Sequence, residues 1–194
     1  MALKKIFVVT HNVDAPTVAA TPDPDAFFRT VMRDLSALDE SAQIPPFQLI
    51  DPSAKGYGFY NISNKVLLFD RAVFLGPLGP SLEISGNIHP TTLNDTKDEL
   101  FFLNVTAIYN CLNIAETVYH RRVGEDVGVD HGLGVKRPAF FPKLIGDSYI
   151  FRIPQMKYAV FVASDGSGSD EDFYTLYQSS ENRGLIFQEL WSDS

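Results

Sequence analysis

The sequence predicts an α+β fold, a mostly antiparallel sheet with a few helices packed on it. Short runs rich in β-branched and aromatic residues recur along the chain and are bounded by turn-forming residues, as is typical of strands. Two other segments repeat apolar residues at helical spacing behind a capping residue. Of the 194 residues, 45% are hydrophobic and 21% are charged, which are ordinary values for a globular protein. We therefore expect a folded chain rather than disorder.

The C-terminal segment 147–190 has the clearest pattern, which we interpret as strand, strand, helix, strand. The first strand is predicted at 148–153. The second is predicted at 158–163, where a continuous apolar run is typical of a strand buried on both faces. A helix follows, Gly184 is expected to end it, and the last strand is predicted at 185–190.

Polar residues precede that helix and are predicted to stabilise its first turn. The hydroxyl of Ser169 can accept a hydrogen bond from a free amide of this turn. Three acidic side chains then place negative charge at the positive end of the helix dipole: Asp170, Glu171 and Asp172. The apolar face of the helix is predicted to consist of Phe173, Leu176 and Tyr177.

The N-terminal part of the chain is predicted to contain a strand, a helix and a second, short strand. Residues 5–10 are rich in Val and Ile and precede a turn-forming segment. Asp23 is a suitable cap and Pro24 suits the first helical position, so a helix is predicted from there to about Leu38. A short strand is expected at 47–50, within a connection rich in Pro, Ser and Asp.

The middle of the chain has less decisive patterns. A strand is predicted at 57–62, and 65–74 fits either a second strand or a short helix. Glycines and prolines at 76–80 mark a break, after which 82–88 is expected to be a strand. The run 99–113 suits a helix by spacing and a sheet by composition, and we predict a strand for its first half.

Residues 124–138 contain four glycines and no hydrophobic period, so they are predicted to form a loop. We expect a single α+β domain over 1–194. If the chain contains two subdomains, the division should fall between Pro80 and Asp95, which separates an N-terminal part (1–80) from a C-terminal part (95–194).

The charge of the chain limits its partners. Its 24 acidic and 16 basic side chains give a formal net charge of -8, which argues against binding nucleic acid or an anionic membrane through phosphate contacts. A basic partner suits it better. The N-terminal apolar run at 6–9 is too short for the core of a signal peptide, and no stretch approaches a membrane span, so a cytoplasmic location is expected.

One motif suggests a metal site. Asp165, Ser167 and Ser169 form a D-x-S-x-S pattern between an expected strand and an expected helix, similar to the metal-binding motif of von Willebrand factor A domains. Hard oxygen ligands of this kind suit magnesium or manganese. A metal-dependent binding module is therefore one alternative. We prefer a polar turn into a capped helix, because little chain remains to supply the other ligands.

A second alternative is a small enzyme. Cys111 is the single cysteine, and with His120 it could form a nucleophile and base, although no activating residues are visible around the pair. Since Cys111 lies in an apolar run, a small buried thiol is the expected interpretation.

Several motifs from Leu82 onward occur together in one protein family. They are Phe101-Phe102-Leu103-Asn104-Val105, Cys111-Leu112-Asn113, the strand at 150–153, the strand end at 161–165 and Gly184-Leu185-Ile186-Phe187. In order and spacing they resemble the immunity proteins of bacterial polymorphic-toxin systems. The resemblance covers residues 82–190.

The resemblance implies a protein that binds a cognate toxin domain and blocks it, without catalysis or cofactor. Such toxins are secreted effectors, delivered for example by contact-dependent or type VI secretion. If the toxin surface is basic, acidic loops of this chain are the expected contact surface. The candidate partner-binding residues are Asp126, Asp130, Asp165, Asp170, Glu171 and Asp172.

Overall fold

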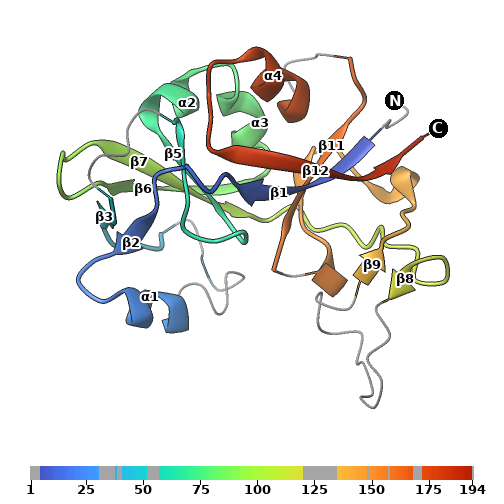
Figure 1. Ribbon diagram of the computed structural model, residues 1–194, viewed down its shortest axis with the longest axis horizontal. Coiled ribbons are helices and arrows are strands. Elements are labelled where there is room, and N and C mark those ends of the chain that lie inside the picture. The colour runs from blue at the N-terminus through green and yellow to red at the C-terminus, as the bar shows by residue number, and fades with distance from the viewer. Residues whose placement is uncertain are drawn as a thin grey trace.

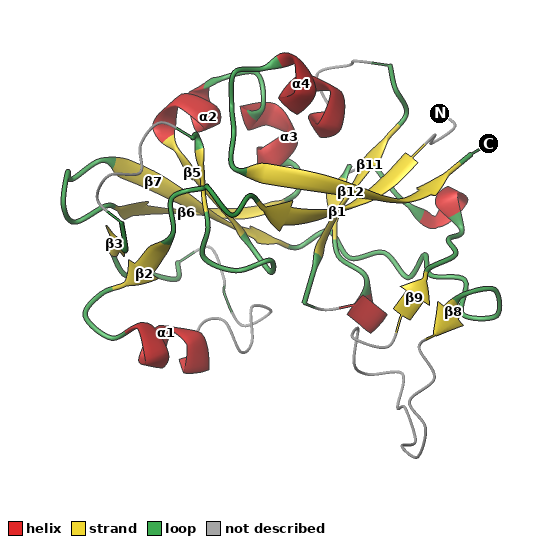
Figure 2. Ribbon diagram, in the orientation of Figure 1, coloured by secondary structure: helices red, strands yellow, loops and turns green. Residues whose placement is uncertain are grey.

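The computed structural model describes residues 5–30, 38, 41–51, 57–119, 135–147, 149–156, 158–167 and 172–193. In these residues, twelve strands form four antiparallel sheets and four short α-helices accompany them. The fold is α+β with mostly antiparallel sheet, as the sequence predicted (Figures 1 and 2).

The first large sheet joins the two ends of the chain. Its order is β10 (Ile150–Phe151), β11 (Val160–Ser164), β1 (Lys5–His11) and β12 (Leu185–Ser192). Strand β1 lies inside the sheet, with Val8 opposite Phe161 on β11 and Val9 opposite Phe187 on β12. The strands predicted at 5–10, 158–163 and 185–190 are therefore confirmed, whereas the one predicted at 148–153 is shorter.

The second large sheet has the order β4 (Phe59–Tyr60), β5 (Leu67–Asp70), β7 (Glu99–Val105) and β6 (Gly86–Thr92). Strand β7 is buried on both faces. Phe101, Leu103 and Val105 point into one apolar cluster, while Leu100 and Phe102 point into another. This explains why the run at 99–105 is continuously apolar although it is a strand.

Two small sheets lie at the periphery of the molecule. One pairs β2 (Val18–Ala20) with β3 (Phe47–Leu49), which confirms the short strand predicted at 47–50. The other pairs β8 (Val118–Tyr119) with β9 (Val135–Arg137), so the end of the predicted loop 124–138 is a strand.

Helices α1 and α2 begin after residues with capping side chains. Helix α1 (Pro24–Thr30) follows Asp23, whose Oδ1 accepts a hydrogen bond from Ala26 N at 2.9 Å, as the sequence predicted. Helix α2 (Arg71–Leu75) follows Asp70, whose Oδ1 accepts from Val73 N at 3.0 Å. Residues 31–37 lie outside the described residues, and Leu38, near which the helix was predicted to end, has no regular secondary structure.

Helices α2, α3 (Gly79–Glu83) and α4 (Phe173–Ser179) lie together on one side of the two large sheets (Figures 1 and 2). The main apolar cluster forms beneath them. It takes Val9 and Val162 from the first sheet, Phe69 and Phe101 from the second, and Phe173 from α4. One core therefore joins both sheets to the helices.

The structure corrects three element assignments in the middle of the chain. Segment 65–74 contains both of the predicted alternatives, since β5 ends at Asp70 and α2 begins at Arg71. The predicted break at 76–80 contains the start of α3. The strand predicted at 82–88 begins only at Gly86, because residues 82 and 83 complete the helix. A short apolar run does not distinguish a buried helix from a strand.

The C-terminal helix is shorter than predicted. Asp172 is its N-cap, in place of Ser169, and Ser180 is its C-cap, in place of Gly184. Gly184 instead opens β12 with φ of +107°, and a Cβ there would lie 2.6 Å from Phe59 O. The glycine is therefore required for a tight approach between β12 and β4.

Each large sheet contains strands from both sides of the division considered between Pro80 and Asp95. Strand β5 pairs with β7, and β1 pairs with β11 and β12. The division considered between Pro80 and Asp95 falls within the second sheet, since β6 occupies residues 86–92.

Candidate functional site

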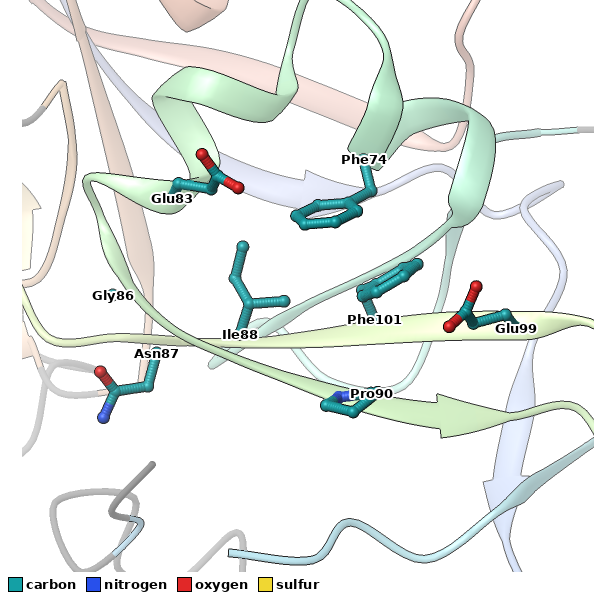
Figure 3. A pocket seen from close by; sticks show the side chains of 8 residues that line it. All are labelled: Phe74, Glu83, Gly86, Asn87, Ile88, Pro90, Glu99 and Phe101. Atoms are coloured by element: carbon teal, nitrogen blue, oxygen red, sulfur yellow. The ribbon is translucent and has the colours of Figure 1, made fainter. Parts of the chain in front are cut away.

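An open groove lies between helices α2 and α3 and the strands β6 and β7 (Figure 3). Its volume is about 590 Å³, within the size range of about 300–1,000 Å³ that is usual for binding clefts. The side chains and backbone that line it belong to Phe74, Glu83, Gly86, Asn87, Ile88, Pro90, Glu99 and Phe101.

Apolar side chains occupy the middle of the groove. In Figure 3, Phe74, Ile88 and Phe101 lie between the two glutamates. Phe74 and Phe101 stack, with 4.3 Å between ring centroids and 24° between ring planes, and Phe101 also stacks on Phe69 at 6.1 Å. Phe101 is 8% exposed, whereas Phe74 and Ile88 are half-buried. The groove thus offers a supported apolar surface that solvent still reaches.

Two carboxylates lie at opposite ends of this apolar surface (Figure 3). Glu83, the last residue of α3, is exposed and forms no ion pair within the described part of the chain. Glu99 is the first residue of β7, and its Oε2 lies 3.0 Å from Arg71 Nη1. The side chains of that pair are 68% and 41% exposed, so the attachment of the guanidinium is weak.

A close backbone contact positions the start of β6 beside α3. Ser85 O accepts hydrogen bonds from Thr106 N at 3.0 Å and from Ala107 N at 3.2 Å. At Gly86 an added Cβ would lie 2.1 Å from Asn104 O, so only glycine fits. The chain therefore passes directly from the end of α3 into the strand that lines the groove.

Pro90 determines how the outer edge of β6 can be used. Leu93 N donates to Asp98 O at 2.8 Å and Thr106 N donates to Ser85 O at 3.0 Å. Because hydrogen-bonded and non-hydrogen-bonded pairs alternate along an antiparallel ladder, these two bonds show which residues of β6 bond to β7. The odd-numbered residues of β6 form hydrogen bonds to β7, whereas the backbone nitrogens of the even-numbered residues, Pro90 among them, face outward. Proline has no N–H to donate, so the groove favours side-chain contacts over an added strand.

The structure buries two of the acids predicted to contact a partner. Asp165 is 4% exposed and Asp172 is 0% exposed, so neither presents a free carboxylate and the prediction is corrected at these positions. Asp126, Asp130, Asp170 and Glu171 lie outside the described residues, and for them it stays a prediction.

Asp172 connects the end of β11 to the start of α4. Its Oδ2 accepts hydrogen bonds from Ser164 Oγ at 2.8 Å, Gly166 N at 3.1 Å and Thr175 Oγ1 at 2.9 Å. Its Oδ1 accepts from Thr175 N at 3.2 Å, which is the helix cap. All of these contacts are internal, so the role of Asp172 is structural.

Asp165 is likewise occupied by internal donors. Its Oδ1 accepts from Ser167 N at 2.8 Å, and its Oδ2 accepts from the Tyr149 hydroxyl at 2.9 Å. Burial raises the pKa of Asp165, but these donors outweigh burial and hold the pKa below its usual value. The described part of the D-x-S-x-S pattern is a polar turn, while Ser169 lies outside the described residues.

In the part of the chain that the structure describes, no three or more His, Cys, Asp or Glu side chains are grouped as a metal site would require. Cys111 is fully buried, as the sequence predicted, and burial raises the pKa of its thiol to about 11. A thiol of that kind is protonated at neutral pH and is a poor nucleophile. His120 lies outside the described residues.

Comparison with known proteins gives no relative: no family model matches the sequence, and a search of curated proteins finds no match. Within the described ranges, no helix has the length and apolar character needed to cross a bilayer.

Sequence reasoning did not identify the groove. Glu83 was assigned to a strand, and Glu99 was considered only as the beginning of a predicted strand. The proline at position 90, just beyond the predicted strand 82–88, was the one local signal, because proline within a sheet indicates an edge. Nothing local indicates that Glu83 and Glu99 enclose one surface.

Proposed function

We propose that this protein is a cytoplasmic immunity protein that binds and neutralises a cognate toxin domain. The observation that carries the proposal is the groove of Figure 3, in which an apolar surface lies between two acidic side chains. An apolar centre with a polar rim is the usual composition of a protein-binding surface. The acidic rim of this surface suits a basic partner.

Most of the residues that match the immunity-protein motifs are buried, and this supports the proposal. Phe102, Cys111, Phe151 and Phe161 are each 0% exposed. The shared pattern therefore corresponds to residues that build a scaffold, and the surface remains free to differ between proteins that recognise different toxins.

The charge of the chain supports fast recognition of a basic toxin. A net charge of -8 attracts a cationic protein over a distance and raises its association rate at low salt. An immunity protein must bind its toxin before the toxin acts, so rapid association suits this function. A secreted effector of a contact-dependent or type VI system is the proposed source of the toxin domain.

The proposal is tested by co-expression with the toxin domain encoded by the adjacent gene. The expected result is survival of a bacterial host that the toxin domain alone inhibits, together with recovery of both proteins as one complex on an affinity column. A host that is inhibited equally with and without this protein, and no complex on the column, would reject the proposal.

A further inference from the structure

We infer that the groove binds a cationic segment of the partner in which arginine or lysine side chains flank an apolar side chain, and that Arg71 competes with this segment for Glu99. The inference rests on the proposed function, since the segment belongs to the neutralised protein. It identifies the binding surface, the chemistry of the ligand and an internal competitor.

The ion pair between Arg71 and Glu99 is an internal example of this chemistry. Arg71 Nη1 lies 3.0 Å from Glu99 Oε2, so the groove already holds a guanidinium at one end. The pair is exposed, and an exposed ion pair contributes little to stability. A cation of the partner can therefore displace Arg71 from Glu99 at little cost.

The other end of the groove has no such competitor. Glu83 is exposed and forms no ion pair among the residues that the structure describes. Between Glu83 and Glu99 lie Phe74, Ile88 and Phe101 (Figure 3). A ligand that contacts the whole groove must present a cation to the carboxylate at each end and an apolar group to the side chains between them.

The backbone of β6 indicates how the segment binds. Because Pro90 removes a donor from the outer edge of the sheet, an extended segment cannot continue the ladder past this position. The segment is therefore held by its side chains, as a helix or loop of the partner would be. This distinguishes the proposal from strand addition, which relies on main-chain hydrogen bonds.

The chemistry is tested on the full chain with a short capped peptide in which arginine and leucine alternate, and binding is followed by calorimetry and by NMR shifts of the Ile88 methyl groups. We expect Glu83→Gln and Glu99→Gln each to weaken binding by about two- to fivefold. Arg71→Gln frees Glu99, so it should tighten binding by about twofold or more.

Matched controls separate the groove from general electrostatics. Glu116→Gln removes an exposed acid elsewhere and Arg29→Gln an exposed base on α1, and neither should change the affinity measurably. A peptide with citrulline in place of arginine should bind no variant. The inference would be overturned if Arg71→Gln and Arg29→Gln bound the peptide with equal affinity. It would also be overturned if Glu83→Gln and Glu99→Gln bound the peptide as tightly as the wild type does.

The same variants, tested against the toxin domain, separate the two proposals. Weaker toxin binding by Glu83→Gln and Glu99→Gln, with unchanged melting temperatures, supports the groove as the docking surface. A toxin complex that all groove variants form equally well overturns the groove inference and leaves the proposed function standing. A wild-type protein that binds the peptide but no toxin domain overturns the proposed function.

Discussion

Asp172 lies beside a loop, and its side chain stabilises the fold through several hydrogen bonds. Its carboxylate is fully buried and accepts hydrogen bonds from Ser164, Gly166 and Thr175. Replacement by alanine removes the acceptor of the buried Ser164 hydroxyl and of the Thr175 cap, and an unsatisfied buried donor costs about 1–3 kcal/mol.

We therefore predict that Asp172→Ala lowers the free energy of unfolding by at least about 1–3 kcal/mol, measured by urea denaturation. Asp172→Asn retains an acceptor for the helix cap and should lose less. If Asp172→Ala unfolds at the wild-type urea concentration, the network does not stabilise the fold.

Asp165 makes stability depend on pH. Its pKa lies below the ordinary value of 3.8, so the ionised carboxylate favours the folded state. That contribution is complete above about pH 3.8 and is lost as the pH falls through the lower pKa of the folded state.

The hydroxyl of Tyr149 is one cause of this shift, because it donates to Asp165 Oδ2. We predict that Tyr149→Phe raises the pKa of Asp165 and moves acid unfolding, followed by circular dichroism, to higher pH. Tyr158→Phe, on the exposed surface, is the matched control. Equal acid midpoints for Tyr149→Phe and the wild type would show that the hydrogen bond does not contribute.

At the scale of elements, strand position determines how much an aromatic residue contributes. Phe102 lies on β7 inside the second sheet and is 0% exposed, with its ring edge-on to Phe27 at 6.2 Å between centroids. Phe187 lies on β12 at the edge of the first sheet and is half-buried. Both residues belong to similar apolar runs in the sequence.

We predict that Phe102→Ala lowers the free energy of unfolding by about 3–5 kcal/mol, as for other fully buried phenylalanines. Phe187→Ala should cost clearly less, because part of its ring is already in contact with water. Thermal and urea denaturation of both variants would measure the difference. Equal losses would mean that the edge of the first sheet is as well packed as the interior of the second.

At the scale of the whole molecule, two large sheets share a core and two small sheets are peripheral. The amides of β1, β7 and β11 lie in strands paired on both sides. The β2–β3 and β8–β9 sheets have only two strands each, and a two-stranded sheet has little stability of its own.

Hydrogen exchange should reflect this arrangement. We predict that the central strands β1, β7 and β11 exchange only by global unfolding, while β2–β3 and β8–β9 exchange much faster by local opening. Mass spectrometry of exchanged peptides would measure the rates. Uniform protection across all four sheets would show that the small sheets unfold together with the core.

Local patterns predicted most of the elements whose signals are local. The cap at Asp23, the strand at β1 and the buried strand β11 follow from residues within a few positions of one another. Errors arose where two structures suit the same residues. Leu82 is predicted in a strand but lies in helix α3. An apolar residue fits a buried strand and a buried helix equally well, and only its packing distinguishes the two.

Composition, periodicity and turn residues by themselves determined the α+β class, the acidic charge and the order of most strands and helices, because these depend on neighbours along the chain. Tertiary structure alone decided that Asp172 is buried in a network and that Glu83 and Glu99 enclose an apolar groove. The groove depends on the pairing of β6 with β7 and on the packing of α2 and α3 beside them, whereas the burial of Asp172 depends on the packing of α4 against β11. Contacts of that kind form between separate elements, and the local pattern of residues within one element does not determine them.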